Sequence, residues 1–270
     1  MKFKEAVKIL SEKGIESAKF DASEIFVRFG GFSRTDLLLN NPQSTDEKVL
    51  SAIRRRSERE PLQYILGEVY FYNECYDVTG DCLIPRPDTE ILVEYATKNI
   101  PEGEYFIDLC TGSGCVGIST LRNTKDTCAT LVDISLPALE IAKKNAKKNG
   151  VEKRAHFELR DALLPYSDKE FFAILSNPPY VTDREYKALM PEIYFEPKIA
   201  LVAKNEGLIF YEKITKIYKD KLKKGGFIAY EIGKDQADSL CKIAESNCMN
   251  IEIIKDYSGN NRVAVLRHKG

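Results

Sequence analysis

Several features that would assign the chain to a particular class are missing. Only two of the 270 residues are histidines, and the seven cysteines form no C-x-x-C pair, so we expect no metal site. No apolar run is long enough to span a membrane, and no signal peptide is evident. The net charge of −1 gives no overall field that would attract nucleic acid. We therefore expect a cytoplasmic protein with reduced thiols.

The residues that are present suit an ordinary folded chain. An apolar fraction of 43% and a charged fraction of 30% are normal for a core and its surface. The length suits one large domain or two unequal ones. Residues 1–63 carry apolar side chains at helical spacing, which predicts a small helical bundle.

Polar residues indicate where these helices begin. We expect Asp21 to cap the second helix and Ser33 the third. Ser44 and Glu47 have the spacing of a capping box and predict a fourth helix that runs to about Glu60. The bundle carries no evident pair of nucleophile and base, so we expect it to serve packing or partner recognition.

A basic run, Arg54 to Arg59, lies near the end of the fourth helix. Positive charge is favourable at a helix C-terminus by itself. Contact with RNA or with an acidic partner is the alternative, and the sequence leaves both interpretations open.

The character of the chain changes after the bundle. Residues 64–84, beginning with Tyr64 and Ile65, are rich in strand formers around Asn73-Glu74 and predict a β-hairpin linker. Residues 85–270 alternate strands and helices, which predicts an α/β domain with a mostly parallel sheet and helices on both faces. A hairpin-like turn at 256–260 predicts one antiparallel strand at the end. The expected strands are 105–109, 130–133, 155–159, 172–176, 227–232, 251–255 and 262–266, and the expected helices are about 90–99 (capped by Asp88 or Thr89), 115–121, 135–149, 207–222 and 236–247.

The segment Asn177-Pro178-Pro179-Tyr180 follows one of these strands directly. Two prolines end the strand, because each lacks an N–H group and fixes φ near −65°. The turn would present the Asn177 amide oxygen, the Pro178 carbonyl and the Tyr180 ring at the sheet edge where ligands bind in open α/β folds. Two acceptors and an aromatic face can hold a planar group that bears an –NH₂. Asn177, Pro178 and Tyr180 are therefore the candidate catalytic residues, with Pro179 beside them in the substrate site.

A glycine loop and three aspartates predict a second ligand at the same edge. Gly112 and Gly114 lie between a strand and a helix, without the third glycine of a dinucleotide fingerprint or the lysine of a Walker loop. Asp133 ends the next strand, where it can accept both hydroxyls of a ribose. Asp161 or its neighbouring backbone can meet an adenine edge, and Asp108 can receive an ammonium group, directly or through water. These features favour an adenosyl group with an amino-acid tail.

At this point the chain resembles the release factor glutamine N5-methyltransferases, the HemK/PrmC family, over nearly its whole length. The segments similar to that family are Glu60–Gly67, Leu83–Glu90, Thr111–Cys115, Val132–Ser135, Asn177–Tyr180, Glu196-Pro197 with Ala200-Leu201, Glu231–Gly233 with Gln236, and Asp256, Gly259 and Arg262. Two departures are visible. Cys110 stands where the family often has glycine, and Lys204-Asn205 stands where a Gly-Gly-like turn is common.

The resemblance implies a Rossmann-like, S-adenosylmethionine-dependent methyltransferase with a seven-stranded sheet and an N-terminal substrate-recognition bundle. It implies transfer of a methyl group to the side-chain amide nitrogen of the glutamine in the Gly-Gly-Gln loop of bacterial peptide release factors. It adds Thr111 and Ser113 to the cofactor site, together with Asn177, and it places Arg86 and Glu196 near the substrate mouth. For these last two residues a structural role remains open. The expected domains are 1–63, 64–84 and 85–270.

Two other functions use the same features. A DNA or RNA adenine-N6 methyltransferase would place a flipped base in the same pocket, but the near-neutral charge and the lack of an added base-recognition domain disfavour it. A binding module that has lost its chemistry is the second alternative. The presence of Asn177, Tyr180, the glycines and the three aspartates disfavours that reading.

Overall fold

The computed structural model describes residues 1–166 and 169–269. The chain forms two compact units. The first contains Met1–Glu68 together with a short return segment, Met190–Phe195, and the second contains Val69–Leu189 and the residues from Glu196 onward. Within the described residues, no helix combines the length and the apolar character that a membrane span requires.

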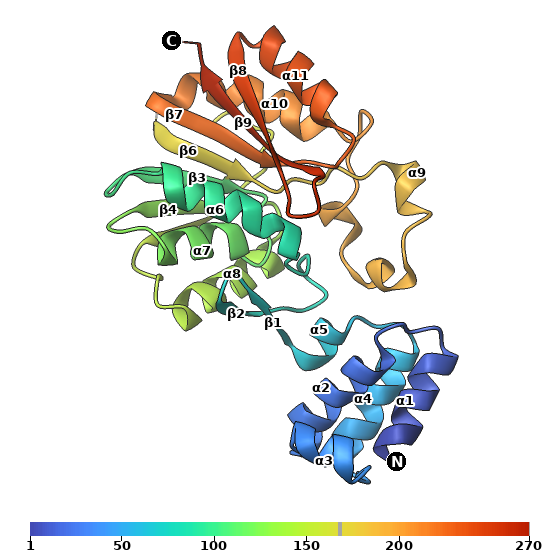
Figure 1. Ribbon diagram of the computed structural model, residues 1–270. Helices are drawn as coiled ribbons and strands as arrows, with labels where there is room; N and C mark the ends of the chain where they lie inside the picture. Colours follow the sequence, from blue (N-terminus) through green and yellow to red (C-terminus); the bar gives the residue numbers. More distant parts are fainter. Residues whose placement is uncertain (167–168, 270) are drawn as a thin grey trace. The chain divides into compact units, whose positions relative to one another are not determined.

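The first unit is the expected helical bundle (Figure 1). Its helices pack their apolar faces together around Phe3, Leu10, Phe26 and Ile53, all of which are buried. Phe3 and Phe26 meet edge to face, with ring centroids 5.5 Å apart. The helices are α1 (Phe3–Glu12), α2 (Ala18–Gly30), α3 (Arg34–Leu39), α4 (Glu47–Ser57) and α5 (Leu62–Leu66).

Two of the expected caps are wrong. Helix α2 begins at Ala18, so Asp21 lies inside its first turn and its carboxylate faces Arg56 instead of a backbone N–H. Asp46, not Ser44, caps α4 by accepting from the Lys48 N–H, while the Ser44 hydroxyl accepts from the Asp46 N–H. Ser33 caps α3 as predicted. Neighbouring acceptors compete for the same few N–H groups, and their spacing does not say which one reaches them.

The basic run at the end of α4 is an internal ion-pair network. Arg56 and Asp21 are both buried and lie 2.7 Å apart. Glu192, in the return segment, accepts from Arg56 at 3.1 Å and from Arg59 at 3.0 Å. Arg55 pairs with its neighbour Glu60. Most of the run is therefore engaged in ion pairs within the first unit, which accounts for these three arginines without a contact to RNA.

We expect Arg56→Met to lower the free energy of unfolding by about 3 kcal/mol, because it leaves the buried Asp21 carboxylate without its partner. Arg54→Met is the matched control. Arg54 is exposed in the same helical turn, so its loss should change the free energy by less than about 0.5 kcal/mol. Urea unfolding followed by circular dichroism measures both. Equal effects of the two substitutions would show that the buried pair adds nothing to stability.

The hairpin after the bundle is shorter than expected. Tyr64 and Ile65 belong to α5, and the strands are β1 (Glu68–Phe71) and β2 (Glu74–Asp77). The turn consists of Tyr72-Asn73, not Asn73-Glu74. Both turn residues have positive φ, 49° and 72°, which matches the type I′ turns that suit the twist of two-residue hairpins.

The second unit is built on a seven-stranded sheet in the order β5-β4-β3-β6-β7-β9-β8 (Figure 1). Strand β9 runs antiparallel to both of its neighbours, so the predicted mostly parallel sheet with one antiparallel strand is confirmed. The strands are β3 (Tyr105–Leu109), β4 (Cys128–Asp133), β5 (Ala155–Leu159), β6 (Phe171–Ser176), β7 (Leu222–Glu231), β8 (Met249–Lys255) and β9 (Asn261–His268).

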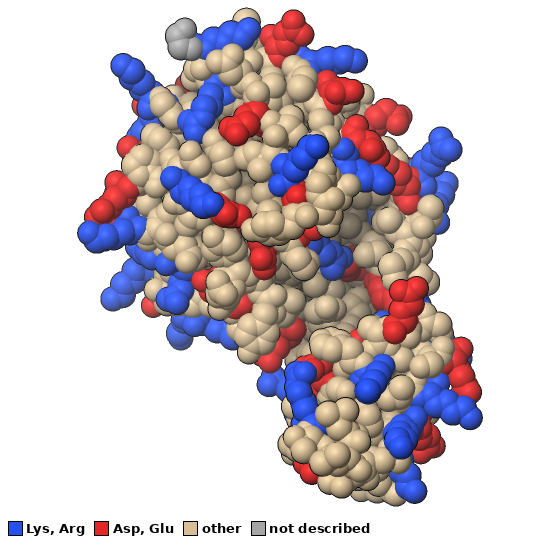
Figure 2. Space-filling model, viewed as in Figure 1, with Lys and Arg blue, Asp and Glu red and all other residues tan. Residues whose placement is uncertain are grey.

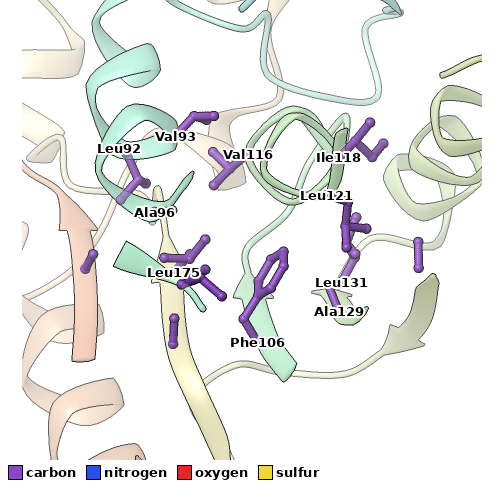
Figure 3. Close-up of a cluster of buried hydrophobic side chains, with 14 of the residues drawn as sticks. Leu92, Val93, Ala96, Phe106, Val116, Ile118, Leu121, Ala129, Leu131 and Leu175 are labelled. Atoms are coloured by element: carbon purple, nitrogen blue, oxygen red, sulfur yellow. The ribbon is translucent and has the colours of Figure 1, made fainter. Parts of the chain in front are cut away.

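Helices cover both faces of this sheet, and each face has its own core. One face packs against α6 (Glu90–Asn99), α7 (Cys115–Arg122) and α8 (Leu136–Lys148); Figure 3 shows Leu92, Phe106 and Val116 of this core. The other face packs against α10 (Ile209–Tyr218) and α11 (Ala237–Ser246). Shorter helical turns of this unit are η1 (Pro87–Thr89), α9 (Asp183–Tyr186), η3 (Lys198–Ala200) and η4 (Lys219–Lys221), and η2 (Pro191–Phe195) lies in the return segment of the first unit.

The register of the parallel strands aligns their carboxyl ends. Leu109, the last residue of β3, pairs with Val132 of β4 and with Ser176 of β6. The segments that follow these strands therefore leave the sheet side by side. This edge carries the glycine loop, Asp133 and Asn177.

Candidate active site

A cavity of about 230 Å³ opens at the carboxyl edge of the sheet, inside the second unit. The residues after β3, β4, β5 and β6 contribute to its wall, as the strand alignment requires. The lining consists of Asp81, Cys82, Leu83, Cys110, Gly112, Asp133, Ile134, Ser135, Ala138, Arg160, Asp161, Ala162, Leu163, Asn177, Pro179, Pro197, Ile199, Ala200 and Phe210.

The loop after β3 turns on three residues with left-handed backbone. Cys110, Gly112 and Gly114 have φ of 61°, 55° and 84°. A Cβ on Gly114 would lie 2.6 Å from the Ile118 side chain, whereas no described atom lies within 4 Å of a Cβ built on Gly112. Gly114 is therefore required for packing, and Gly112 leaves room for a ligand close to the backbone. The positive φ at Cys110 explains why glycine would also suit this position.

Asp108 lies beneath this loop instead of in the cavity. It is 1% exposed, and its Oδ2 accepts from the Thr111 hydroxyl at 2.5 Å and from the Gly117 N–H at 3.0 Å. Burial raises the pKa of its carboxyl to about 7. The structure thus places Asp108 as a support that ties the loop to α7, and its contact with an ammonium group, directly or through water, stays a prediction.

The raised pKa of Asp108 makes stability depend on pH. The folded protein keeps this proton up to about pH 7, whereas an unfolded aspartate loses it near pH 4, so stability should fall as pH rises between these values. From about pH 5 to about pH 7.5 the wild type should lose about 2 kcal/mol relative to Asp108→Asn. Urea unfolding at both pH values tests this, with the exposed Asp235→Asn expected to follow the wild type. Parallel pH profiles for wild type and Asp108→Asn would contradict the assignment.

Two of the predicted aspartates do reach the cavity. Asp133 accepts from the Gly112 N–H at 2.8 Å and from the Ser135 N–H at 2.9 Å, and burial raises the pKa of its carboxyl. Asp161 lines the same cavity and accepts from the Leu163 N–H at 2.8 Å. The backbone bonds hold each carboxylate at the end of its strand.

The other predicted loop residues shape the loop from behind. Thr111 and Ser113 are buried, and the Thr111 hydroxyl is committed to Asp108. The Ser113 carbonyl accepts from the Asn145 amide at 2.9 Å. The loop residues that line the cavity are Cys110 and Gly112.

Asn177 enters the cavity with a defined orientation. Its Nδ2 donates to the Thr89 hydroxyl oxygen at 3.3 Å, which leaves Oδ1 as the other end of the amide. Pro179 lines the cavity beside it, whereas Pro178 is buried and Tyr180 is half-buried outside the described lining. The Tyr180 hydroxyl donates to Glu231, and burial raises its pKa well above the usual value.

The turn is braced from behind at Tyr180. The Gln236 Nε2 donates to the Tyr180 carbonyl at 3.3 Å, and the Gln236 Oε1 accepts from the Gly233 N–H at 2.9 Å. Gly207 lies against the same carbonyl: a Cβ there would come within 2.1 Å of the Tyr180 oxygen. The backbone of Asn205 and Glu206, just before it, is left-handed as well. The chain thus makes its turn here without the Gly-Gly pair that is common in the resembling family.

Arg86 and Glu196 pair with each other. The Arg86 guanidinium donates to Glu196 Oε1, and the Ile84 N–H donates to Glu196 Oε2 at 3.0 Å. The Glu196 carboxylate is buried, so it holds the segment that begins at Pro197 against the chain at 84–86. These contacts support the structural role that the sequence left open. Pro197, Ile199 and Ala200, which follow Glu196, supply part of the cavity wall.

Sequence reasoning assigned no role to several residues of the site. The apolar part of the wall, including Ile134, Leu163 and Phe210, has no local signal that separates it from core. Thr89 and Glu231 stand in segments similar to the family, but neither was linked to Asn177. Asp88 or Thr89 was expected only as a cap of α6, and that prediction is wrong, because α6 has no side-chain cap. The connection of Thr89 and Glu231 to Asn177 becomes visible only when the chain after residue 86 and the end of β7 meet in space.

Charge on the surface is mixed. Figure 2 shows Lys and Arg interspersed with Asp and Glu over the face in view, on both units. This agrees with the net charge of −1.

A mostly parallel sheet with a glycine loop after β3, an acidic residue at the end of β4 and an Asn-Pro-Pro-Tyr turn after β6 defines a methyltransferase. Residues 87–224 match the methyltransferase small domain, and residues 3–67 match the PrmC N-terminal domain. A solved ribosomal protein L11 methylase from Lactobacillus delbrueckii shares the fold, with a TM-score of 0.51 at 17% identity over 69% of this chain and 81% of that one.

Relatives narrow the assignment. The chain is 38% identical to a release factor glutamine methyltransferase from Thermodesulfovibrio yellowstonii, over 92% of this chain and 91% of that protein. It is 36% identical to a protein of the same name from Fusobacterium nucleatum, over 98% of this chain and 77% of that protein. The chain belongs to the release factor glutamine methyltransferase family.

Proposed function

We propose that the protein transfers a methyl group from S-adenosylmethionine to the side-chain amide nitrogen, N5, of the glutamine in the Gly-Gly-Gln motif of peptide chain release factors. Family membership supports the substrate. The observation that carries the chemistry is the Asn177 amide, whose Nδ2 is occupied by Thr89 while the residue lines the cavity. An acceptor oxygen in that position selects a group with N–H bonds to donate.

The residues of the cavity fit the proposed cofactor. Asp133 presents a carboxylate for a ribose, and apolar side chains such as Ile134 and Leu163 suit the faces of an adenine. Gly112 lets a ligand approach the backbone, and Asp161 lies beyond the end of β5. When bound, S-adenosylmethionine supplies an electrophilic methyl group on a sulfonium. Asp108, Thr111, Ser113 and Gly114 support this site by holding the loop in shape.

In the proposal, the Asn177–Tyr180 turn promotes methyl transfer by orienting the glutamine amide. An amide nitrogen is a poor nucleophile because its lone pair is delocalised into the carbonyl. In the proposal, Asn177 Oδ1 and the Pro178 carbonyl accept the two N–H bonds of the glutamine amide and fix its plane, and the Tyr180 ring packs against it. Positioning is the main contribution, and acceptors that strengthen as the nitrogen becomes positive add electrostatic stabilisation. No general base is required before transfer, because the proton becomes acidic only as the new bond forms.

The remaining parts of the chain receive roles by the same proposal. Residues 1–63 recognise the release factor, 64–84 link, and 85–270 carry out the transfer. Phe20, Leu38 and Leu39 are exposed apolar side chains on the bundle, and such residues suit a protein contact better than contact with nucleic acid. A release factor would be met in the cytoplasm, where we expect the protein to act.

The test is incubation of the purified protein with radiolabelled S-adenosylmethionine and three candidate acceptors. These are a release factor, its Gln→Ala loop variant and double-stranded DNA. Label on the intact factor that is lost in the variant supports the proposal. Label on DNA would keep the Asn177 chemistry and overturn the substrate, and cofactor binding without any transfer would indicate a binding module.

A further inference from the structure

Glu231 is a buried carboxylate behind the turn that carries Asn177. It ends β7 and is 2% exposed. Strands β6 and β7 are parallel, with Ser176 opposite Tyr230. Asn177, which follows β6, and Glu231, the last residue of β7, are therefore neighbours at the same edge. A charge that is buried this deeply needs partners, and the described cavity lining does not include it.

The partners of Glu231 are two hydroxyl groups. The Thr89 hydroxyl donates to its Oε2 at 2.5 Å, and the Tyr180 hydroxyl donates to its Oε1 at 3.2 Å. Thr89 is itself buried, and its oxygen is the atom that faces Asn177 Nδ2. A single carboxylate therefore contacts both Thr89, which accepts from the Asn177 amide, and Tyr180, the aromatic residue of the same turn as Asn177.

The direction of these bonds fixes the Asn177 amide. An ionised carboxylate can only accept, so Thr89 must spend its one proton on Glu231. Toward Asn177 the Thr89 oxygen can then only accept, and the amide must present its NH₂ there. The amide oxygen consequently faces the other way, where an acceptor is needed for a substrate –NH₂.

We propose that Glu231 is a positioning residue for methyl transfer. It fixes the direction of the Asn177 amide through Thr89, and it holds the Tyr180 ring by accepting from the hydroxyl of that ring. The inference rests on the function proposed above. It assigns Glu231 no contact with substrate or cofactor.

Arg262 brings a positive charge close to this arrangement. Its guanidinium lies 3.0 Å from Asp88 and 3.2 Å from Asp256. Burial raises the pKa of the Glu231 carboxyl, and the Thr89 hydroxyl, the positive charge of Arg262 and the Tyr180 hydroxyl oppose that rise. Asp88 immediately precedes Thr89, so the same cluster holds the backbone next to the relaying hydroxyl. The buried carboxylate thus has two hydroxyl donors and one nearby cation that favour its charged form.

The experiment compares Glu231→Gln with two variants of Thr89. A glutamine can accept from only one hydroxyl, and its NH₂ can instead donate to Thr89, which then donates to Asn177 and reverses the amide. We expect Glu231→Gln to lower kcat about tenfold while the Kd for S-adenosylmethionine stays within about twofold. Thr89→Val should match this loss, and Thr89→Ser, which keeps the hydroxyl, should retain near wild-type kcat.

Two further readouts separate positioning from support of the fold. The double variant Glu231→Gln/Thr89→Val should lose no more than about the larger single loss, because both act through the same contact. A release factor whose Gly-Gly-Gln glutamine is replaced by glutamate is the second probe. As a competitor it offers only acceptors, so relative to the unaltered factor it should bind about fivefold better to Glu231→Gln than to the wild type.

The outcomes are distinct. An active wild type with an equally active Glu231→Gln overturns the role of Glu231 and leaves the proposed function standing. Additive losses with a lower melting temperature and an unchanged preference for the glutamate competitor would also overturn it, in favour of simple structural support. Failure of the wild type to label the factor overturns the proposed function, and this inference with it. If Glu231→Gln does not fold, Thr89→Val against Thr89→Ser decides the question.

Discussion

Replacing Asn177 by alanine is expected to lower kcat for glutamine methylation by about a hundred- to a thousandfold, the range found when one preorganised hydrogen-bonding group is removed from an active site. The substitution removes Oδ1, the acceptor proposed to aim the substrate amide, while Asp133 and Asp161 remain in the cavity. Affinity for S-adenosylmethionine should fall much less, by about threefold or less. Single-turnover kinetics and calorimetric titration of the cofactor measure the two quantities separately.

Thr182→Ala is the matched control for Asn177→Ala. Thr182 follows the turn by two residues and caps α9 by accepting from the Glu185 N–H, so its loss changes the same loop without touching the amide. Its kcat should stay within about threefold of wild type. If Asn177→Ala lost cofactor affinity and kcat to the same extent, Asn177 would belong to the cofactor site instead.

Gly207→Ala should reduce activity about a hundredfold or more, although Gly207 does not line the cavity. A Cβ at this position would lie 2.1 Å from the Tyr180 carbonyl oxygen and 2.9 Å from Gln236 Nε2. Neither the carbonyl nor its brace can yield without moving the turn, and a displacement of about 1 Å at a catalytic group can cost a hundredfold. Steady-state kinetics and the free energy of unfolding should both be measured, because overpacking also costs about 1–3 kcal/mol.

Gly259→Ala isolates the clash from the backbone conformation. Gly207 and Gly259 have similar φ, 79° and 86°, but no described atom lies within 4 Å of a Cβ built on Gly259. Both substitutions therefore carry the same conformational strain, about 1–2 kcal/mol, and only one displaces the turn. Comparable losses of activity in the two variants would mean that strain, and not contact with Tyr180, explains the effect.

Periodic patterns predicted the frame of the second unit well. Strands β3 and β5 and helix α6 have the predicted bounds, because short apolar runs between polar turns leave few alternatives. The alignment of carboxyl ends then follows from parallel pairing, which is why Asp133, Asp161 and Asn177 were correctly expected at one edge. The order of the last strands, with β9 between β7 and β8, depends on tertiary packing and cannot be predicted from the periodicity of the sequence.

The side-chain roles were less predictable, for a physical reason. Asp108 stands near the end of a strand, as the other aspartates do, yet its carboxylate is buried and accepts from Thr111 and Gly117. Glu231 and Thr89 are separated by more than half of the chain and acquire their relation to Asn177 only through folding. Likewise Tyr64 has the character of a strand former, but its position after Pro61 places it in α5. The sequence shows which functional groups are present near the site, but the packing of the folded chain decides what each of them contacts.

The return segment also bears on how separable the bundle is. Its ion-pair network takes Arg56, Arg59 and Asp21 from the beginning of the chain and Glu192 from far along it. A fragment cut after Glu68 would contain every helix of the bundle and still lack one of the two acids that neutralise its buried arginine. The helices of the bundle are contiguous in the sequence, but the first unit also needs a segment from much later in the chain. Gene fusions or domain exchanges that treat residues 1–68 as an independent cassette would transplant an incomplete fold.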